Sequence, residues 1–218
     1  MGPQESIQKT YMNISLGKLR KRSDEKDSKA VQRELKDKSK VYERVYQSIT
    51  GVLESITMKD HEEYGKSWIL NLEAEGEIYA VQVQEDSRYG TDLLKRLPRL
   101  HKKSIYKFTP YDFTRNGKHR AGLAIEDESG KKIESFFQSF SGNEKDGWKV
   151  ENLNGFPNFG GDSRDKDDLK IYFTQVTKFL RNYALKHLQT EFLEPAPPVE
   201  IAEHDDSVPS PSDGDLPF

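Results

Sequence analysis

Alternation of apolar and polar residues with a period of two, interrupted by turn residues, is the feature that most constrains the fold of this chain. It runs through residues 41–140 and predicts strands over residues 49–58, 67–74, 78–84, 104–113 and 120–126. Asn116-Gly117 separates the last two runs and favours a tight hairpin, because both turn positions adopt positive φ. One short helix, over residues 92–97 and stopped by Pro98, follows the third strand. The pattern predicts a mainly β domain, with a further apolar run over 133–140 and a Gly- and Asn-rich loop over 141–161.

A second periodicity marks the clearest helix in the sequence, over residues 164–193. Its apolar residues recur at spacings of three and four, at Leu169, Tyr172, Phe173, Val176, Phe179, Leu180, Tyr183 and Leu188. Asp165, Asp167 and Asp168 lie at its N-terminal end, where the helix dipole favours negative charge. We expect this amphipathic helix to pack its apolar stripe against the sheet.

The first 40 residues form a basic N-terminal extension with little apolar patterning. A short alternating run over residues 11–16 predicts one strand. Residues 20–40 hold nine Lys or Arg against five Asp or Glu, with only Val31 and Leu35 at helical spacing. We interpret residues 20–40 as a flexible or weakly helical connection.

Charge divides the chain into two unequal parts. The formal net charge is −3, but residues 1–193 carry +4 and residues 194–218 carry −7. Residues 194–218 also hold six of the ten prolines and no Lys or Arg. Such a composition cannot offset the entropy of ordering, so it predicts a disordered acidic tail. A tail that only confers solubility has no need of the Leu216, Pro217 and Phe218 with which this one ends.

Two absences narrow the class of protein further. The sequence has no cysteine, which excludes disulfides, thiolate metal sites and a cysteine nucleophile. It has no run of about 20 apolar residues and no apolar N-terminal segment of the signal-peptide kind. We therefore expect a cytoplasmic protein without a membrane span.

The order of three strands, a short helix and two strands resembles the OB-fold, a five-stranded Greek-key barrel. The end of the sequence resembles the acidic tip of bacterial and bacteriophage single-stranded DNA-binding proteins, in which acids precede a short apolar element ending in Pro-Phe. The matching residues are Asp213, Asp215, Leu216, Pro217 and Phe218, with Asp205 and Asp206 upstream. The N-terminal 40 residues and the long helix have no counterpart in the ordinary bacterial protein, which favours the bacteriophage-like type.

This resemblance implies an OB-fold DNA-binding domain over residues 41–163, supported by the helix over 164–193. It implies non-specific binding and protection of single-stranded DNA during replication, recombination or repair, in a bacterial or phage-infected cell. It further implies that the tip, Asp213, Asp215, Leu216, Pro217 and Phe218, binds partner proteins. In that reading the Phe218 ring enters an apolar pocket of the partner, its α-carboxylate pairs with Arg or Lys, and the acids steer the encounter.

The basic hairpin falls where an OB-fold places the loop between its fourth and fifth strands, which flanks bound oligonucleotide. Aromatic rings on the preceding strand can stack on bases at roughly 1–3 kcal/mol each. The candidate DNA-binding residues are Arg20, Lys21, Arg22, Lys66, Tyr106, Lys107, Phe108, Tyr111, Arg115, Lys118, His119 and Arg120. Because successive side chains of a strand point to opposite faces, about half of the rings on this strand should lie in the core. The sequence pattern does not show which half. Trp68 and Tyr79 share their faces with aliphatic residues, so we expect them in the core.

Two other classes of function stay open. An OB-fold adaptor that binds only proteins would use the acidic tail as its main working part. A metal-dependent phosphodiesterase would need Asp162, Asp165, Asp167 and Asp168 in a cleft, but their spacing is not that of an EF-hand and helix N-terminal acids explain them simply. The five histidines show no ligand spacing and no nucleophile motif occurs, so we expect no enzyme, catalytic residue, metal or cofactor.

Overall fold

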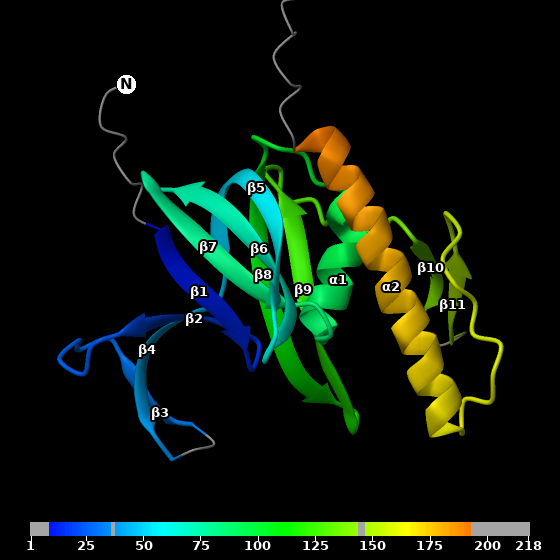
Figure 1. Ribbon diagram of the computed structural model, residues 1–218, viewed down its shortest axis with the longest axis horizontal. Helices are drawn as coiled ribbons and strands as arrows, with labels where there is room; N and C mark the ends of the chain where they lie inside the picture. Colours follow the sequence, from blue (N-terminus) through cyan, green and yellow to red (C-terminus); the bar gives the residue numbers. More distant parts are fainter. Residues whose placement is uncertain (1–8, 36–37, 144–146, 193–218) are drawn as a thin grey trace, which may run out of the picture.

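The computed structural model describes residues 9–35, 38–143 and 147–192, and shows a mainly β protein with two α-helices (Figure 1). The elements, in chain order, are β1 (Lys9–Ser15), β2 (Lys18–Ser23), β3 (Val31–Glu34), β4 (Lys40–Tyr46), β5 (Ile49–His61), β6 (Gly65–Ala74), β7 (Glu77–Gln84), α1 (Arg88–Arg96), the 3-10 turn η1 (Leu97–Arg99), β8 (Ile105–Arg115), β9 (Lys118–Asp127), β10 (Gln138–Asn143), β11 (Gly147–Asn152) and α2 (Lys166–Glu191). The strands and the short helix predicted between residues 49 and 127 are all present, in the predicted order. Neither helix in the described part of the chain is both long and apolar enough to cross a membrane.

Nine strands form one sheet in the order β3-β4-β2-β1-β7-β6-β5-β8-β9. The strands β5, β6 and β7 form an antiparallel meander, and β8 pairs antiparallel with both β5 and β9. In place of the five-stranded barrel expected from the sequence, the described strands leave this sheet open, with β3 and β9 at its two edges. The expected strand set is therefore part of a larger sheet.

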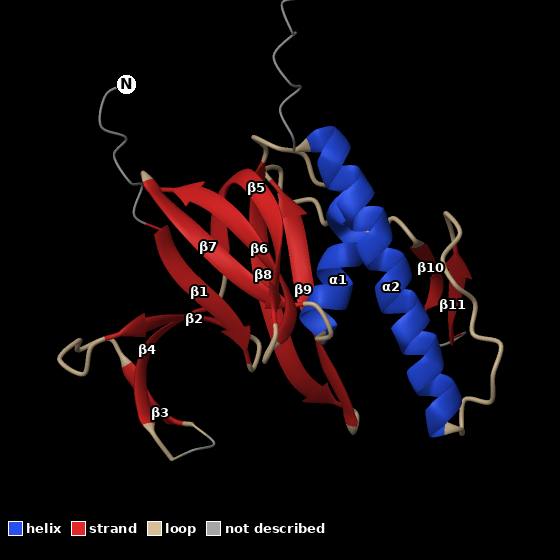
Figure 2. Ribbon diagram, viewed as in Figure 1, coloured by secondary structure: helices blue, strands red, loops and turns tan. Residues whose placement is uncertain are grey.

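The core lies between the curved sheet and the helices. Alternation with a period of two places apolar residues on one face of the sheet, and this face is the buried one. Trp68, Leu70 and Leu72 on β6 are completely buried, which confirms Trp68 as a core residue. Tyr79 on β7 is partly buried and packs against the same core, as expected. Figure 2 shows both helices on the same side of the large sheet.

The N-terminal extension holds more strands than its sequence predicted. The predicted strand over residues 11–16 corresponds to β1, which pairs parallel with β7. The expectation for residues 20–40 is wrong, because β2 and β3 lie there and both pair antiparallel with β4. A buried carboxylate replaces apolar packing at this point: Glu43 on β4 is 1% exposed and pairs with Arg20 at 3.2 Å and Arg33 at 2.8 Å. Charged residues thus supply contacts that no hydropathy pattern reveals.

The short helix α1 begins at a local capping signal. The Ser87 side chain caps it by accepting a hydrogen bond from Gly90 N at 3.0 Å. Its Leu93 and Leu94 are buried in the core.

The long helix α2 occupies most of the range predicted for it. Asp165 caps it by accepting hydrogen bonds from the backbone N–H groups of Asp167 and Asp168. Buried residues spaced at helical intervals, Val176, Leu180, Ala184 and Leu188, face the rest of the molecule. Most of the predicted stripe therefore packs inward, but Phe173, which the periodicity assigned to it, is 60% exposed.

Residues 133–161 fold differently from the expected strand and loop. The strand β10 begins only at Gln138, and β11 lies inside the expected loop and pairs with β10 as a separate two-stranded sheet. Phe137 is completely buried, and its ring packs edge-on against Tyr183 at 4.9 Å between centroids. This aromatic contact joins the segment to α2.

Candidate nucleic-acid interface

The hairpin formed by β8 and β9 has the predicted turn. Arg115 pairs with Lys118 across it, and Asn116 and Gly117 have φ values of 52° and 70°. Two successive positive φ values define the tight turn that suits the twist of a hairpin. The tip of this hairpin projects beyond the ends of β5, β6 and β7 (Figure 1).

The structure resolves which rings of β8 face outward. Tyr106 and Phe108 are 4% and 1% exposed and belong to the core, so they are unavailable as stacking platforms. Both project from the face of β8 that packs inward. Tyr111 and Phe113 lie on the opposite face, where Phe113 is 46% exposed. Their ring centroids are 5.8 Å apart.

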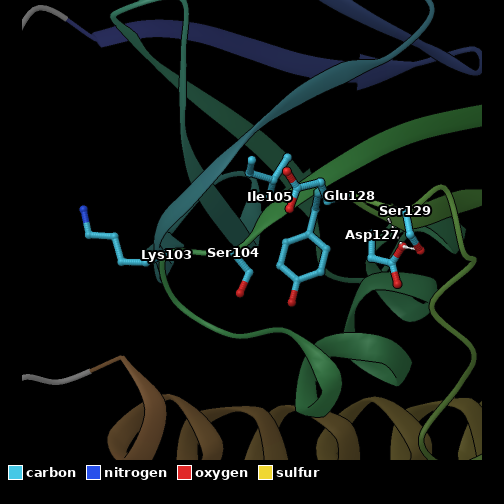
Figure 3. Close-up of a pocket in the computed structure, with 7 residues that line it drawn as sticks. Lys103, Ser104, Ile105, Asp127, Glu128 and Ser129 are labelled. Carbon is cyan, nitrogen blue, oxygen red and sulfur yellow. Dashed lines mark hydrogen bonds between the residues drawn. The ribbon is translucent and has the colours of Figure 1, made fainter.

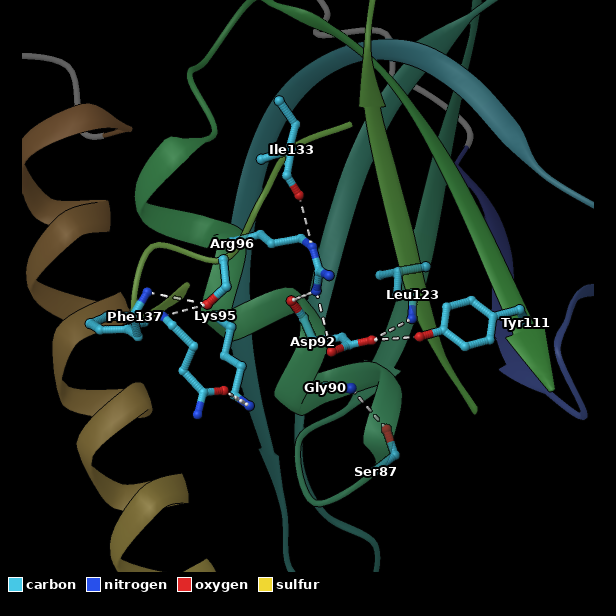
Figure 4. A network of polar contacts seen from close by, with 11 residues as sticks. Ser87, Gly90, Asp92, Lys95, Arg96, Tyr111, Leu123, Ile133 and Phe137 are labelled. Atoms are coloured by element: carbon cyan, nitrogen blue, oxygen red, sulfur yellow. Dashed lines mark hydrogen bonds and ion pairs between the residues drawn. The ribbon is translucent and has the colours of Figure 1, made fainter. Parts of the chain in front are cut away.

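Tyr111 is held across the neighbouring strand. Its hydroxyl donates to Asp92 Oδ2 at 3.4 Å, and the same oxygen accepts from Leu123 N at 3.0 Å (Figure 4). The ring reaches Asp92 because it passes over Gly122, where a Cβ would collide with both the tyrosine ring and the carboxylate. Burial is the main cause that raises the pKa of Tyr111, so its hydroxyl stays protonated at neutral pH.

Three cations share the outer face of the hairpin with these rings. Phe113 lies opposite Arg120, and Arg115 lies opposite Lys118. Both pairs project from the same face of the hairpin as Tyr111. Arg115, Lys118 and Arg120 are exposed and form no ion pair with any residue that the structure describes. We call this set the hairpin surface; its members are Tyr111, Phe113, Arg115, Lys118 and Arg120.

Three other candidates near this surface have different surroundings. His119 lies on the opposite face of the hairpin, where Nε2 is 2.6 Å from Asp112 Oδ1. Lys107 pairs with Glu126 at 3.2 Å, and Lys66 pairs with Asp60. These contacts offset the positive charges of Lys107 and Lys66.

The basic N-terminal cluster is divided by the sheet. Arg20 points toward the buried Glu43 and so acts as an internal partner. Lys21 and Arg22 line a cavity of about 430 Å³, together with Ser23, Asp24 and Arg44. We call this the N-terminal basic cavity. Sequence reasoning missed Arg44, whose contribution depends on the pairing of β2 with β4.

A tight turn brings the N-terminal strands against the hairpin. Gly17, with φ of 68°, joins β1 to β2 and donates its N–H to the Tyr89 hydroxyl at 2.9 Å. A Cβ on Gly17 would lie 2.5 Å from Asp112 N, so this position requires glycine for space as well as for conformation. The turn therefore packs directly on β8.

A polar groove lies on the outer face of β1 and β7. It has a volume of about 420 Å³ and is lined by Asn13, Ile14, Ser15, Arg33, Tyr64, Gln82 and Gln84. Tyr64, in the turn between β5 and β6, is 66% exposed. Sequence reasoning missed this ring because Tyr64 lies in the turn, outside the alternating runs.

A larger open cavity lies at the other end of the β8–β9 ladder. It measures about 710 Å³, and its lining includes Ser104, Tyr106, Asp127 and Ser129 (Figure 3). The Asp127 carboxylate accepts hydrogen bonds from the Ser129 hydroxyl at 2.6 Å and from Lys131 N at 3.0 Å, which lower its pKa. This acid organises a turn, and the cavity contains no cation of the hairpin surface.

The acids at the start of α2 have structural partners. Asp162 pairs with Arg164 at 2.8 Å, and Asp168 Oδ2 accepts from Asp162 N at 2.9 Å. In the described ranges no group of three or more His, Asp or Glu is placed to hold a metal ion. Asp205, Asp206 and the tip residues Asp213, Asp215, Leu216, Pro217 and Phe218 lie outside the described residues.

No protein-family model, no curated protein and no solved structure matches this chain.

Proposed function

We propose that this chain binds single-stranded DNA without sequence preference, in the manner of a bacteriophage-like single-stranded DNA-binding protein. The hairpin surface carries the proposal. It combines an exposed ring, a second ring fixed beside it and three exposed cations, none paired with a described acid, on one face of a projecting hairpin. Rings stack on bases of any sequence and cations neutralise phosphates, which together give sequence-tolerant binding.

The connectivity of the sheet supports an OB-type core. Within the larger sheet, β7-β6-β5-β8-β9 follows the order third, second, first, fourth, fifth, and α1 comes between β7 and β8. This is the strand order of an OB-fold, whose second and third strands and fourth-to-fifth loop bind oligonucleotides. The equivalent regions here are the sheet around the polar groove and the hairpin surface.

The two N-terminal features extend the proposed path of the strand. The polar groove offers amides and the Tyr64 ring, while its one cation, Arg33, is already paired with Glu43. It therefore suits bases better than phosphates. The N-terminal basic cavity suits a phosphate through Lys21 and Arg22, because its third cation, Arg44, is paired with Asp27.

Binding of fluorescently labelled oligo-dT, with duplex DNA as competitor, tests the proposal. The triple variant Arg115→Glu, Lys118→Glu and Arg120→Glu should bind roughly tenfold or more weakly at moderate salt, because three phosphate contacts become repulsive. The matched control is Lys166→Glu, Lys170→Glu and Lys178→Glu, three exposed lysines of α2 that form no ion pair with a described residue. Both triple variants change the net charge equally, so only the position of the charges differs.

A wild-type chain that does not bind oligo-dT would reject the proposal and favour the adaptor that binds only proteins. Equal weakening in the two triple variants would show a response to net charge and would remove the hairpin from the site. We further propose that the acidic tip recruits replication, recombination or repair proteins. Loss of partner binding in the variant Phe218→Ala, with oligo-dT affinity retained, tests that part separately.

A further inference from the structure

A further cavity lies between the helices and extends to Ala121 of β9, next to the hairpin surface. It measures about 470 Å³ and lies between α1, the first half of α2 and β10. Its apolar lining residues are Ala121, Phe156, Tyr172, Phe173 and Val176. Phe173 is 60% exposed, although it belongs to the apolar stripe of the helix. Phe173 and the other apolar lining residues form a contiguous apolar surface, which is the kind of surface that marks interaction sites.

The apolar surface continues from the cavity onto the two-stranded sheet. Gln138 lines the cavity, and Phe140 projects from the same face of β10, two residues further along. Phe140 lies opposite Val150 of β11, and more than half of each side chain is exposed. We call the cavity and this extension the α2 groove.

A cation lies inside this apolar site. Lys95 Nζ donates to Gln138 Oε1 at 2.7 Å and lies 5.2 Å from the centroid of the Phe156 ring. Burial is the main cause that lowers the pKa of Lys95, so an anion beside it would be favoured. An ammonium group has three donors, and the described contacts use one of them for a hydrogen bond.

The other charges of the groove leave it attractive to an acidic ligand. Arg88, whose Nη1 donates to the His119 carbonyl oxygen at 3.2 Å, is a second cation of the lining. Asp92 also lines the cavity, but its carboxylate pairs with Arg96 at 3.2 Å and accepts from Leu123 N (Figure 4). Asp86 is the remaining acid. The groove therefore suits a segment that carries large apolar side chains next to carboxylates.

We infer that the α2 groove binds residues 213–218 of this same chain, with Phe218 and Leu216 in the apolar cavity and Asp213 and Asp215 toward Lys95 and Arg88. Among the segments outside the described residues, this is the one that combines carboxylates with an aromatic ring. Residues 1–8, 36–37 and 144–146 contain no aromatic residue.

The length of the chain permits this contact within one molecule. The axis of α2 from Thr177 to its end spans about 22 Å at 1.5 Å per residue. A flexible chain of the length of residues 193–218 has an r.m.s. reach of about 25–30 Å. Tethering at that distance gives an effective concentration on the order of millimolar, so even weak affinity would keep the groove occupied.

Disulfide trapping in the full chain tests the inference, because the sequence contains no cysteine that would interfere. One variant combines Thr177→Cys, inside the groove, with Leu216→Cys. The matched control combines Gln175→Cys with Leu216→Cys, since Gln175 is exposed on the same helix and does not line the groove. The intramolecular disulfide should form roughly tenfold faster at position 177 than at position 175.

Two additional variants examine the chemistry of the groove. Adding Lys95→Met or Phe173→Ala to the Thr177 variant should reduce its rate toward that of the control, while the Gln175 rate stays unchanged. Equal rates at positions 177 and 175 would overturn the inference. A disulfide-linked dimer as the main product at position 177 would also overturn it, by assigning the groove to the segment of a second copy. Neither outcome depends on DNA, so the result is independent of the proposed function.

Discussion

At the scale of single residues, the role proposed for β8 depends on which side of the strand each aromatic ring occupies. The sequence places four rings on this strand, at both parities, so alternation alone does not distinguish the core face from the outer face. The structure makes the distinction: the core takes Tyr106 and Phe108, and the hairpin surface takes Tyr111 and Phe113. The sequence pattern of β8 could not show this, because the orientation of Tyr111 depends on contacts with Gly122 and Asp92 in other elements.

The first prediction compares two phenylalanines of β8 that differ in burial. Phe113→Ala should weaken oligo-dT binding by roughly 1–3 kcal/mol, because a stacking ring is lost, and should leave the melting temperature nearly unchanged. Phe108→Ala should instead lower the free energy of unfolding by roughly 3–5 kcal/mol, because it opens a cavity in the core. Fluorescence titration and urea unfolding of both variants measure the two effects. Oligo-dT affinity unchanged in Phe113→Ala would show that this ring contacts no base.

At the scale of elements, the sequence predicted best those segments whose stability comes from apolar burial. The strands from β5 to β9 and the helix α2 carry clear periods of two and 3.6 residues, and all of them are present. The sequence pattern did not predict β2, β3 and β4 as separate strands. Their inner contacts come from Arg20, Arg33 and the buried Glu43, which produce no alternation of apolar and polar residues. Likewise, β11 lies in a segment rich in glycine and asparagine that has no alternating run.

A buried ion pair fixes α2 to the end of β7. Glu85, 4% exposed, accepts from Arg181 Nε at 2.8 Å and from Trp68 Nε1 at 3.3 Å. Arg181→Met should lower the free energy of unfolding by roughly 3 kcal/mol, because it leaves a buried carboxylate without its partner. Urea unfolding of the variant measures this loss.

Two variants separate the buried charge from the loss of an arginine. Adding Glu85→Gln to Arg181→Met should recover most of the stability, since the amide oxygen can still accept from Trp68. Arg164→Met, which breaks the exposed pair with Asp162, should have no measurable effect. If the double variant is no more stable than Arg181→Met alone, the unpaired charge is not the cause of the loss.

The N-terminal strands should respond to acid through Glu43. Hydrogen bonds from Arg33, followed by those from Arg20, hold the pKa of Glu43 below its ordinary value of 4.5. A carboxyl whose pKa is lower in the folded state contributes stability that is complete above its unfolded pKa and is lost as pH falls through the folded value. The contribution of Glu43 should therefore be constant from neutral pH to about pH 4.5 and decline below it.

The variant Glu43→Gln isolates that contribution. It should be less stable than the parent by about 2 kcal/mol at neutral pH, because hydrogen bonds to a charged group are lost. The difference between the two proteins should shrink on acidification, since the parent then loses the same charge. Urea unfolding at a series of pH values gives both curves. Parallel curves down to the acid limit would show that Glu43 does not supply this part of the pH dependence.

At the scale of the whole molecule, charge is arranged in opposing parts. The cations of the hairpin surface and of the N-terminal basic cavity belong to residues 1–193, which carry +4 in total, while residues 194–218 carry −7. If the chain binds DNA as proposed, the tethered acidic segment should compete with DNA phosphates for the same cations at high effective concentration. The balance between them should depend on salt, since screening acts over about 10 Å at 0.1 M ionic strength.

The last prediction follows from this competition. Truncation after Leu193 should tighten oligo-dT binding, most strongly at low salt, because the competing carboxylates are removed. A full-length variant with the seven tail acids replaced by Asn or Gln keeps the tether but removes the charge, and it should match the truncated protein. Fluorescence titrations over a range of salt concentrations should show the gap between parent and variants closing as salt rises. If the neutralised tail binds oligo-dT like the parent while the truncation binds more tightly, bulk of the tail and not its charge limits access to the site.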